Sequence, residues 1–331
     1  MLSTIVIKNS YNELFHIGEL TVYTYGFCIA IGLLAAFALF FFISKKFKLA
    51  DKSFDFYSLD VIISIVVGFL FGSLYQAIYD WIDSGFKEFA FDGMSFMGGL
   101  IGGVATFLVI TAIFAKGQTR KDFWKVANLI APCITIAHGC GRIGCLFGRC
   151  CYGVPNDSIF SVKYDRFAHP VLATQLLEAL FLFILTAVLV FLLLKYKRID
   201  LMMLIYLYGY AVWRFTIEFW RDDDRGAFIP GISPSQFQSI VMILIAAALT
   251  VYIFYFNRIP FFGKELVGRT YRDVILAEVE AAKLAEAQAE QESGEVETAE
   301  GTETGDAEET TTETAETPPV GDGSGKEKER T

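Results

Sequence analysis

The chain has 331 residues, of which 54% are hydrophobic and 32 are phenylalanine. A water-soluble domain usually holds about 45–50% apolar residues, so this excess excludes an ordinary soluble protein. The formal net charge of −9 arises mostly from acidic residues beyond position 270. Because no basic stripe follows the chain, the composition also excludes a nucleic-acid partner.

The N-terminal region does not resemble a cleavable signal peptide. Its first 19 residues are polar, and no cleavage site of small residues follows a short apolar core. We therefore expect the first apolar run to stay in the protein as a membrane span.

Seven apolar segments follow, each near the ~20 residues that a helix needs to cross ~30 Å of hydrocarbon. They cover residues 21–43, 57–79, 97–115, 126–140, 170–194, 201–220 and 237–257. The fourth segment is the weakest, because it is short and contains Pro132. The predicted fold class is all-α: a polytopic membrane helical bundle with about seven transmembrane helices.

Lysine and arginine residues cluster in alternate connections between these segments. The clusters are Lys45, Lys46, Lys48 and Lys52; Lys116, Arg120, Lys121 and Lys125; Lys195, Lys197 and Arg198; and Arg258, Lys264, Arg269 and Arg272. Cytoplasmic loops of membrane proteins carry such an excess. The pattern predicts an N-terminus outside the cell and a C-terminus in the cytoplasm.

Three regions follow from composition. Residues 1–260 form the predicted transmembrane domain, and residues 261–292 form a juxtamembrane segment whose Ala, Glu and Leu content favours a helix. Residues 293–331 contain almost no large apolar side chain, so they cannot bury enough surface to offset chain entropy. We interpret them as a disordered acidic tail.

A glycine- and arginine-rich stretch runs from His138 to Gly153, at the outer end of the fourth segment. An arginine inside a membrane costs at least ~2.5 kcal/mol, so its presence indicates a function. Arg142 lies between Gly141 and Gly144, where the backbone can approach a ligand and a guanidinium can bind a phosphate. The alternative is a turn whose arginines reach to lipid phosphates, and this we prefer for Arg149.

A second charged group lies in the sixth segment. Arg214 and Glu218 are four residues apart and share one helix face, and Arg221 follows at the membrane edge. Such a pair must face the bundle interior or a wet cavity. A buried ion pair that only fixes helix packing, with Arg221 as an ordinary anchor, is the alternative.

Further polar or small residues complete the candidate set. Tyr25 and Gly26 open the first segment, Gly98 and Gly99 open the third, and Gln175 lies near the start of the fifth with Glu178. For Gly98 and Gly99 we prefer close helix packing as the interpretation, and room for a lipid is the alternative. Glu178 lies about two turns into its helix and needs a partner. At the start of the seventh segment, Ser235 is a candidate capping residue.

Four of the six cysteines, Cys140, Cys145, Cys150 and Cys151, fall within twelve residues. Their spacing matches neither a secreted disulfide framework nor a zinc motif, and three histidines nearly exclude a His-rich metal site. We therefore predict no metal and no cofactor. The cysteines serve either as small packing residues or as a disulfide that braces the loop.

In their order, these phrases resemble the bacterial prolipoprotein diacylglyceryl transferase family, over about residues 18–257. The phrases are Tyr25-Gly26, Ser95 with Gly98-Gly99, Gly141-Arg142-Ile143-Gly144, His169-Pro170 with Gln175 and Glu178, Trp213-Arg214-Phe215 with Glu218 and Arg221, and Ser233 with Gln236 and Ser239. Each phrase alone is weak, and six in order on a seven-span frame are fairly specific.

The resemblance implies transfer of diacylglycerol from phosphatidylglycerol to the thiol of a lipobox cysteine in a prolipoprotein signal peptide. Glycerol phosphate leaves in this reaction. Arg142 and Arg214 would hold the phosphate, Tyr25 would position the head group, and Glu218 would orient Arg214. Gly153 matches the last glycine of the family signature. The implied location is the bacterial cell membrane, with membrane lipids around a multi-pass protein.

The chain departs from the family pattern at four positions. Met97 stands where the family has a histidine, Cys145 where it has an asparagine, Cys150 where it has an acid, and Arg149 where it has a glycine. Methionine cannot act as a base, so His138 is the substitute that the sequence offers.

Three alternative functions stay open at this point. The first is a divergent member that binds or modifies lipid without lipoprotein transfer. The second is a membrane thiol-redox or metal-binding protein that uses the four clustered cysteines, and the third is a transporter. The transferase requires Arg142 and Arg214, whereas a thiol protein requires the cysteines.

Overall fold

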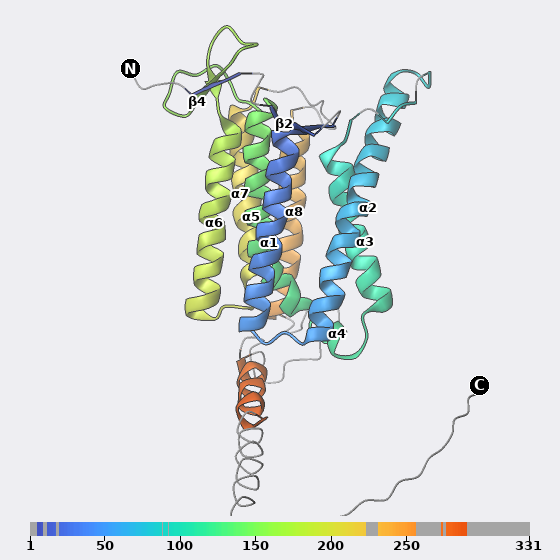
Figure 1. The fold of residues 1–331 in the computed structure, drawn as a ribbon, viewed down its shortest axis with the longest axis vertical. Coiled ribbons are helices and arrows are strands. Elements are labelled where there is room, and N and C mark those ends of the chain that lie inside the picture. Colours follow the sequence, from blue (N-terminus) through green and yellow to red (C-terminus); the bar gives the residue numbers. More distant parts are fainter. Residues whose placement is uncertain are drawn as a thin grey trace, which may run out of the picture. The chain divides into compact units, whose positions relative to one another are not determined.

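The computed structural model of the chain (Figure 1) describes residues 5–8, 12–17, 20–87, 89–91, 93–222, 231–255, 273 and 276–289. The chain divides into two compact units, Met1–Val279 and Glu280–Thr331. Residues 276–289, within the predicted juxtamembrane segment, are helical. The predicted disordered tail at 293–331 lies outside the described residues.

Long antiparallel helices make up the first unit (Figure 1). They are α1 (Thr24–Lys46), α2 (Asp51–Asp83), α3 (Phe96–Phe114), α4 (Gly117–Lys121), α5 (Phe123–Phe147), α6 (Thr174–Tyr196), α7 (Met202–Ile217) and α8 (Pro234–Thr250). A 3₁₀ turn, Glu218–Trp220, follows α7, and a π-helical turn, Val251–Tyr255, follows α8.

Six helices are long and apolar enough to cross a membrane, which confirms the polytopic helical class. They are Thr24–Lys46, Asp51–Ile82, Phe96–Phe114, Phe123–Phe147, Thr174–Tyr196 and Pro234–Tyr255. The segment predicted at 201–220 forms α7, which has only 16 residues. It is short because the chain tightens into the 3₁₀ turn at Glu218, and it packs against α5, α6 and α8.

Helix α5 is the centre of the bundle and packs against α1, α6 and α7. The fourth span was predicted too short, at 126–140, because its glycines suggested a turn. Instead the helix continues to Phe147. Glycine weakens a helix by about 1 kcal/mol, but here it permits close packing. A Cβ at Gly32 of α1 would lie 2.8 Å from Cys140 Cβ of α5.

Helices α2 and α3 form a closely packed pair. A Cβ built on Gly98 would lie 2.4 Å from Tyr75 Cβ, and one built on Gly99 would lie 3.3 Å from the Gly68 carbonyl oxygen. Only glycine permits these backbones to approach so closely. Of the two roles predicted for Gly98 and Gly99, the structure places them in helix packing against α2.

Short strands cover one end of the bundle. β1 (Ile5–Ile7) pairs in parallel with β4 (Ser161–Tyr164), which pairs antiparallel with β5 (Val171–Leu172). β2 (Glu13–Ile17) and β3 (Leu20–Tyr23) form a hairpin that leads into α1. An isolated bridge between Gly153 and Arg221 ties the loop after α5 to the end of α7.

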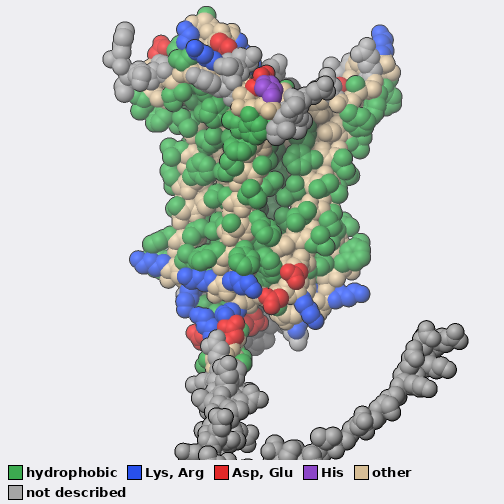
Figure 2. All heavy atoms as spheres, in the orientation of Figure 1, with side chains coloured by type: hydrophobic (Ala, Val, Ile, Leu, Met, Phe, Trp, Pro, Cys, Tyr) green, Lys and Arg blue, Asp and Glu red, His purple; other side chains and the backbone are tan. Residues whose placement is uncertain are grey.

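Hydrophobic side chains cover the sides of the bundle along its length, as Figure 2 shows. Leu34 and Leu70, for example, are exposed. Basic residues end α1 (Lys45 and Lys46), α4 and α6 (Lys195), all at the end opposite the strands. This arrangement is typical of a helical bundle in a bilayer, with one basic end.

Candidate active site

Arg142 of α5 lies in a buried polar cluster with residues of α6 and α7. Its Nε atom is 3.2 Å from Glu178 Oε2 and donates to His138 Nε2 at 3.2 Å. The Glu178 side chain is fully buried, and Tyr210 donates to its other oxygen at 2.9 Å. Because His138 is one turn before Arg142, the helix itself brings the two side chains together.

A second cluster surrounds Arg214 of α7. Its Nη2 atom is 3.0 Å from Glu218 Oε2, one turn further on, and contacts Ser235 Oγ at 2.5 Å. Arg221 Nε lies 3.6 Å from the same Glu218 oxygen. The Nη1 atom of Arg214 is buried and has no hydrogen-bond partner among the described residues. One buried guanidinium donor therefore has no acceptor within the part of the chain that the structure describes.

The two clusters act on one another electrostatically. The strongest electrostatic interaction of Glu178 is with Arg142. Weaker ones follow with Arg214, His138 and Arg221. Three guanidinium groups thus face two carboxylates, Glu178 and Glu218. Charged groups in such a buried region act on an anion much more strongly than they would in water.

Two of the predicted glycines border open space. Neither Gly26 nor Gly141 would have an atom within 4 Å of an added Cβ, whereas Gly144 would contact Tyr25 at 3.1 Å. A pocket of about 510 Å³ lies at the start of α1. It is lined by Asn12, Val22, Tyr23, Tyr25, Gly26, Phe27, Gly148 and Cys150. Tyr25 and Gly26 therefore lie where a ligand has room.

The remaining predicted residues have protein partners. Gln175 is buried and donates to the Cys150 carbonyl and to Tyr164 Oη. A Cβ at Gly153 would lie 2.5 Å from the Trp220 carbonyl oxygen, so this glycine permits the bridge to Arg221. Both residues hold the loop after α5 in place. Arg149 forms an ion pair with Asp165, rather than extending freely to lipid.

Sequence reasoning missed three contributors to these clusters. Glu178 was left without an assigned partner, although a carboxylate two turns inside a membrane helix requires one. Tyr210 gave no signal beyond its place in an aromatic helix. Ser235 is not the capping residue: Ser233 caps α8 because Pro234 occupies the first helical position, and this leaves Ser235 for Arg214.

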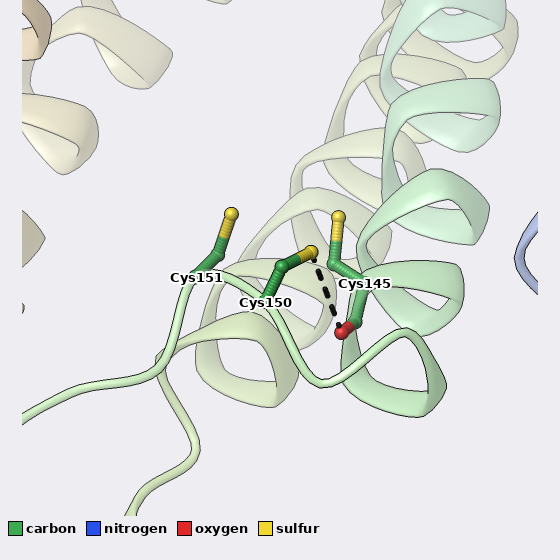
Figure 3. A group of neighbouring side chains, drawn as sticks. All are labelled: Cys145, Cys150 and Cys151. Carbon is green, nitrogen blue, oxygen red and sulfur yellow. Dashed lines mark hydrogen bonds between the residues drawn. The ribbon is translucent and has the colours of Figure 1, made fainter. Parts of the chain in front are cut away.

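Three of the four clustered cysteines come together. The sulfur atoms of Cys145, Cys150 and Cys151 all lie within 4.8 Å of one another. Figure 3 shows the Cys150 sulfur directed towards Cys145, whose carbonyl oxygen it contacts at 3.8 Å. Cys140 packs against Gly32 of α1 instead. All six cysteines are free, so the disulfide brace, one of the two roles that the sequence leaves open, is not formed in this structure.

The two thiols of the loop differ in acidity. Hydrogen bonds with Cys145 and Cys150, together with Arg221 and Arg142, lower the pKa of the Cys151 thiol well below its usual range. For Cys150 the hydrogen bond with Cys145 lowers the pKa, but the bond with Cys151 and burial outweigh it and raise the pKa to about 11.

Fold and site together define a polytopic helical membrane protein with a buried cluster of arginine and glutamate side chains near one end of the bundle. The family model described as prolipoprotein diacylglyceryl transferase matches residues 12–252. The chain belongs to this family, which confirms the family and the enzyme class that the sequence predicts.

Named relatives agree over most of the chain. One is phosphatidylglycerol–prolipoprotein diacylglyceryl transferase 2 of Clostridium perfringens, 31% identical over 68% of this chain and 88% of its own length. The enzyme of Clostridium tetani is 32% identical over 74% of this chain and 96% of its own. That of Dehalococcoides mccartyi is 28% identical over 72% and 92%.

Proposed function

We propose that this protein transfers diacylglycerol from phosphatidylglycerol to the cysteine thiol of prolipoprotein signal peptides, in the bacterial cytoplasmic membrane. The observation that carries the proposal is the buried Nη1 donor of Arg214, which lacks a protein acceptor in the described part of the chain. A phosphate oxygen satisfies such a donor, and a charge-assisted hydrogen bond of this kind is stronger than a neutral one.

In this proposal two guanidinium groups bind the phosphate of the lipid. Arg142 is held by Glu178 and His138, and Arg214 by Glu218 and Ser235. These partners fix both forks before the lipid arrives, so little side-chain entropy is lost on binding. Tyr25 and Gly26, at the pocket beside the start of α1, receive the glycerol head group or the adjoining glycerol carbons.

The transfer step is a displacement at carbon. The substrate cysteine loses its proton, which ends on the released phosphate or in water. Its thiolate forms a bond to the diacylglycerol carbon that carries the phosphate, and the bond between that carbon and the phosphate oxygen breaks. Glycerol phosphate leaves with the electron pair. Charge therefore grows on the phosphate oxygens, and fixed guanidinium donors in a dry site stabilise it without having to reorganise.

His138 positions Arg142 in this proposal. Its Nε2 atom accepts the hydrogen bond from Arg142 Nε, so the lone pair that a base would use is engaged. The ring also lies near the rings of Phe96 and Tyr210. The positive field of the arginines favours the thiolate form of the incoming cysteine, whose unperturbed pKa is about 8.5. Met97 then needs no acid–base role.

A purified-enzyme assay tests the proposal. The full-length protein in proteoliposomes is given phosphatidylglycerol and a synthetic signal peptide with a lipobox cysteine, and the modified peptide is measured by mass spectrometry. We expect a peptide that gains diacylglyceryl and the release of glycerol phosphate. A peptide with serine in place of cysteine is the control. No modification by an enzyme that still binds the lipid would point to the divergent lipid-binding function.

Growth of a conditional transferase-depleted bacterium provides the second measurement. The wild-type gene should restore growth, and the Arg142→Ala and Arg214→Ala variants should not, although both proteins accumulate. Arg198→Ala is the matched control, because among the described residues the Arg198 side chain pairs with Asp200, in the connection between α6 and α7. Growth restored by both cluster variants would overturn the proposed role of the arginines.

A further inference from the structure

The loop after α5 gathers three thiols that the proposed transfer does not use. Cys145 lies in the last turns of α5, and Cys150 and Cys151 lie on the loop that follows (Figure 3). The three sulfur atoms lie within 4.8 Å of one another. Among the described residues, this is the one group of ligand side chains close enough to hold a metal ion.

The spacing of the sulfur atoms suits coordination. Zinc binds thiolate sulfur at about 2.3 Å, so neighbouring sulfur atoms around a tetrahedral ion lie about 3.8 Å apart. A disulfide requires about 2.05 Å and a specific dihedral angle. Small side-chain rotations bring the observed triangle to the first geometry, whereas the second needs a much larger approach.

The backbone of the loop is arranged to bring the thiols together. Cys151 has a φ of 63° and Arg149 a φ of 56°, both in the left-handed region that residues other than glycine rarely adopt. The Cys150 amide donates to the Cys145 carbonyl at 3.3 Å, and the Gln175 side chain donates to the Cys150 carbonyl. Strain of this kind persists only where surrounding contacts enforce it.

The neighbouring charges favour an anionic centre. Arg142 and Arg221 both lie within electrostatic reach of Cys151. Three thiolates around a divalent ion leave one net negative charge, and around a monovalent ion two. Such a centre complements the nearby guanidinium groups better than three neutral thiols do.

We propose that Cys145, Cys150 and Cys151 bind one soft, thiophilic cation of the zinc(II) or copper(I) class. Thiolate ligands select these ions over magnesium, calcium and manganese. The ion ties the last turn of α5 to the loop that leads to Gly153 and Arg221. Its role is structural, and the proposal stands independently of the transfer reaction.

The test is metal binding by the purified, full-length, reduced protein in detergent. Cadmium(II) serves as the probe for the zinc(II) class, because its thiolate complexes absorb in the near ultraviolet. Copper(I) is titrated separately against a chelator, so that binding of the zinc(II) and copper(I) classes can be compared. We expect about one equivalent of metal and a thiolate charge-transfer band. Elemental analysis of protein purified without oxygen identifies the ion that it acquires in the cell.

Two sets of variants make the test specific. The triple variant C145S/C150S/C151S should lose the band, and Cys150→Ser alone, at an exposed position, should weaken binding at least about tenfold while the protein still folds. The double variant C28S/C140S should bind as wild type does, because those thiols lie at the contact between α1 and α5.

Three outcomes would overturn the proposal. One is a wild-type protein without a metal-dependent band. Another is a C28S/C140S variant that loses as much metal as the triple variant. The last is a peptide spanning residues 143–153 that is two hydrogen atoms lighter before reduction than after, since this mass difference reveals a disulfide.

Discussion

Glu178 of α6 lies 3.2 Å from Arg142 of α5, and its side chain is fully buried. The two residues are 36 positions apart in the sequence and are joined by the packing of α5 on α6. Through this contact the Glu178 carboxylate pairs with the Arg142 guanidinium, which we propose to bind phosphate. It fixes the orientation of Arg142 and offsets its charge when no lipid is present.

Replacement of Glu178 by glutamine should destabilise the protein by about 3 kcal/mol, because it leaves a buried guanidinium without its counter-ion. Thermal unfolding in detergent measures this loss. Phosphatidylglycerol should stabilise the variant more than the wild type, since its phosphate supplies the missing negative charge. Asp200→Asn, in the Arg198 pair with partial exposure, is the control and should cost less than about 1 kcal/mol.

Replacement of Arg214 by lysine should lower turnover at least about a hundredfold, as the loss of one positioned donor to a developing oxyanion does. A single ammonium cannot contact Ser235, Glu218 and a phosphate together in the geometry of the planar fork. Arg198→Lys is the matched control. Near-normal turnover by the Arg214→Lys enzyme would refute the proposed contact of Arg214 with the phosphate.

Replacement of Tyr210 by phenylalanine should reduce turnover about tenfold, because a hydrogen bond to a charged group contributes about 1.5–3 kcal/mol. The hydroxyl that donates to Glu178 Oε1 disappears, while the ring against His138 stays. Tyr206→Phe is the control, since Tyr206 stacks on Tyr210 with its ring. Equal effects of the two substitutions would show that the Tyr210 hydroxyl is unimportant.

The membrane class and most of the helices could be predicted from the sequence because long apolar runs have one stable structure in lipid. The C-terminal end of α5 could not be predicted from the sequence. Its glycines lower helix propensity locally, and only the contact with α1, for example at Gly32, explains why the helix continues. For α7 the apolar pattern was correct, but the 3₁₀ turn at Glu218 shortened the helix.

The site could be predicted in part, for a related reason. Arg214 and Glu218 form a pair within one helix, which a spacing of four residues reveals. The pair of Arg142 and Glu178 joins two helices, and sequence spacing carries no information about such contacts. Similarly, Cys140 and Cys145 are near in sequence but five residues apart on α5, so they point to different faces.

The orientation of the bundle is a further prediction. Reporter domains fused in the connections at 47–50 and 197–201 should be active in the cytoplasm, and a fusion at 84–87 should be active outside. The reason is the basic end of the bundle, which carries Lys45, Lys46 and Lys195. A reporter at 197–201 that works only outside the cell would invert the topology and place the arginine cluster near the inner leaflet.

Two glycines of the bundle should respond oppositely to alanine. A Cβ at Gly32 would lie 2.8 Å from Cys140 Cβ and 3.0 Å from the Ala137 carbonyl oxygen, so Gly32→Ala should destabilise the protein by about 1–3 kcal/mol. A Cβ at Gly141 would meet nothing within 4 Å. Gly141→Ala should therefore stabilise helix α5 by up to about 1 kcal/mol. Thermal unfolding in detergent compares the two variants.

The Gly141 variant also tests where the lipid lies. If the open space beside Gly141 receives the phosphate-bearing part of the lipid next to Arg142, an added methyl group should raise the KM for phosphatidylglycerol several-fold and leave folding intact. Gly26→Ala, beside the pocket at the start of α1, provides the comparison within the same site. An unchanged KM in Gly141→Ala, together with a raised KM in Gly26→Ala, would place the lipid at α1 and remove Gly141 from the binding surface.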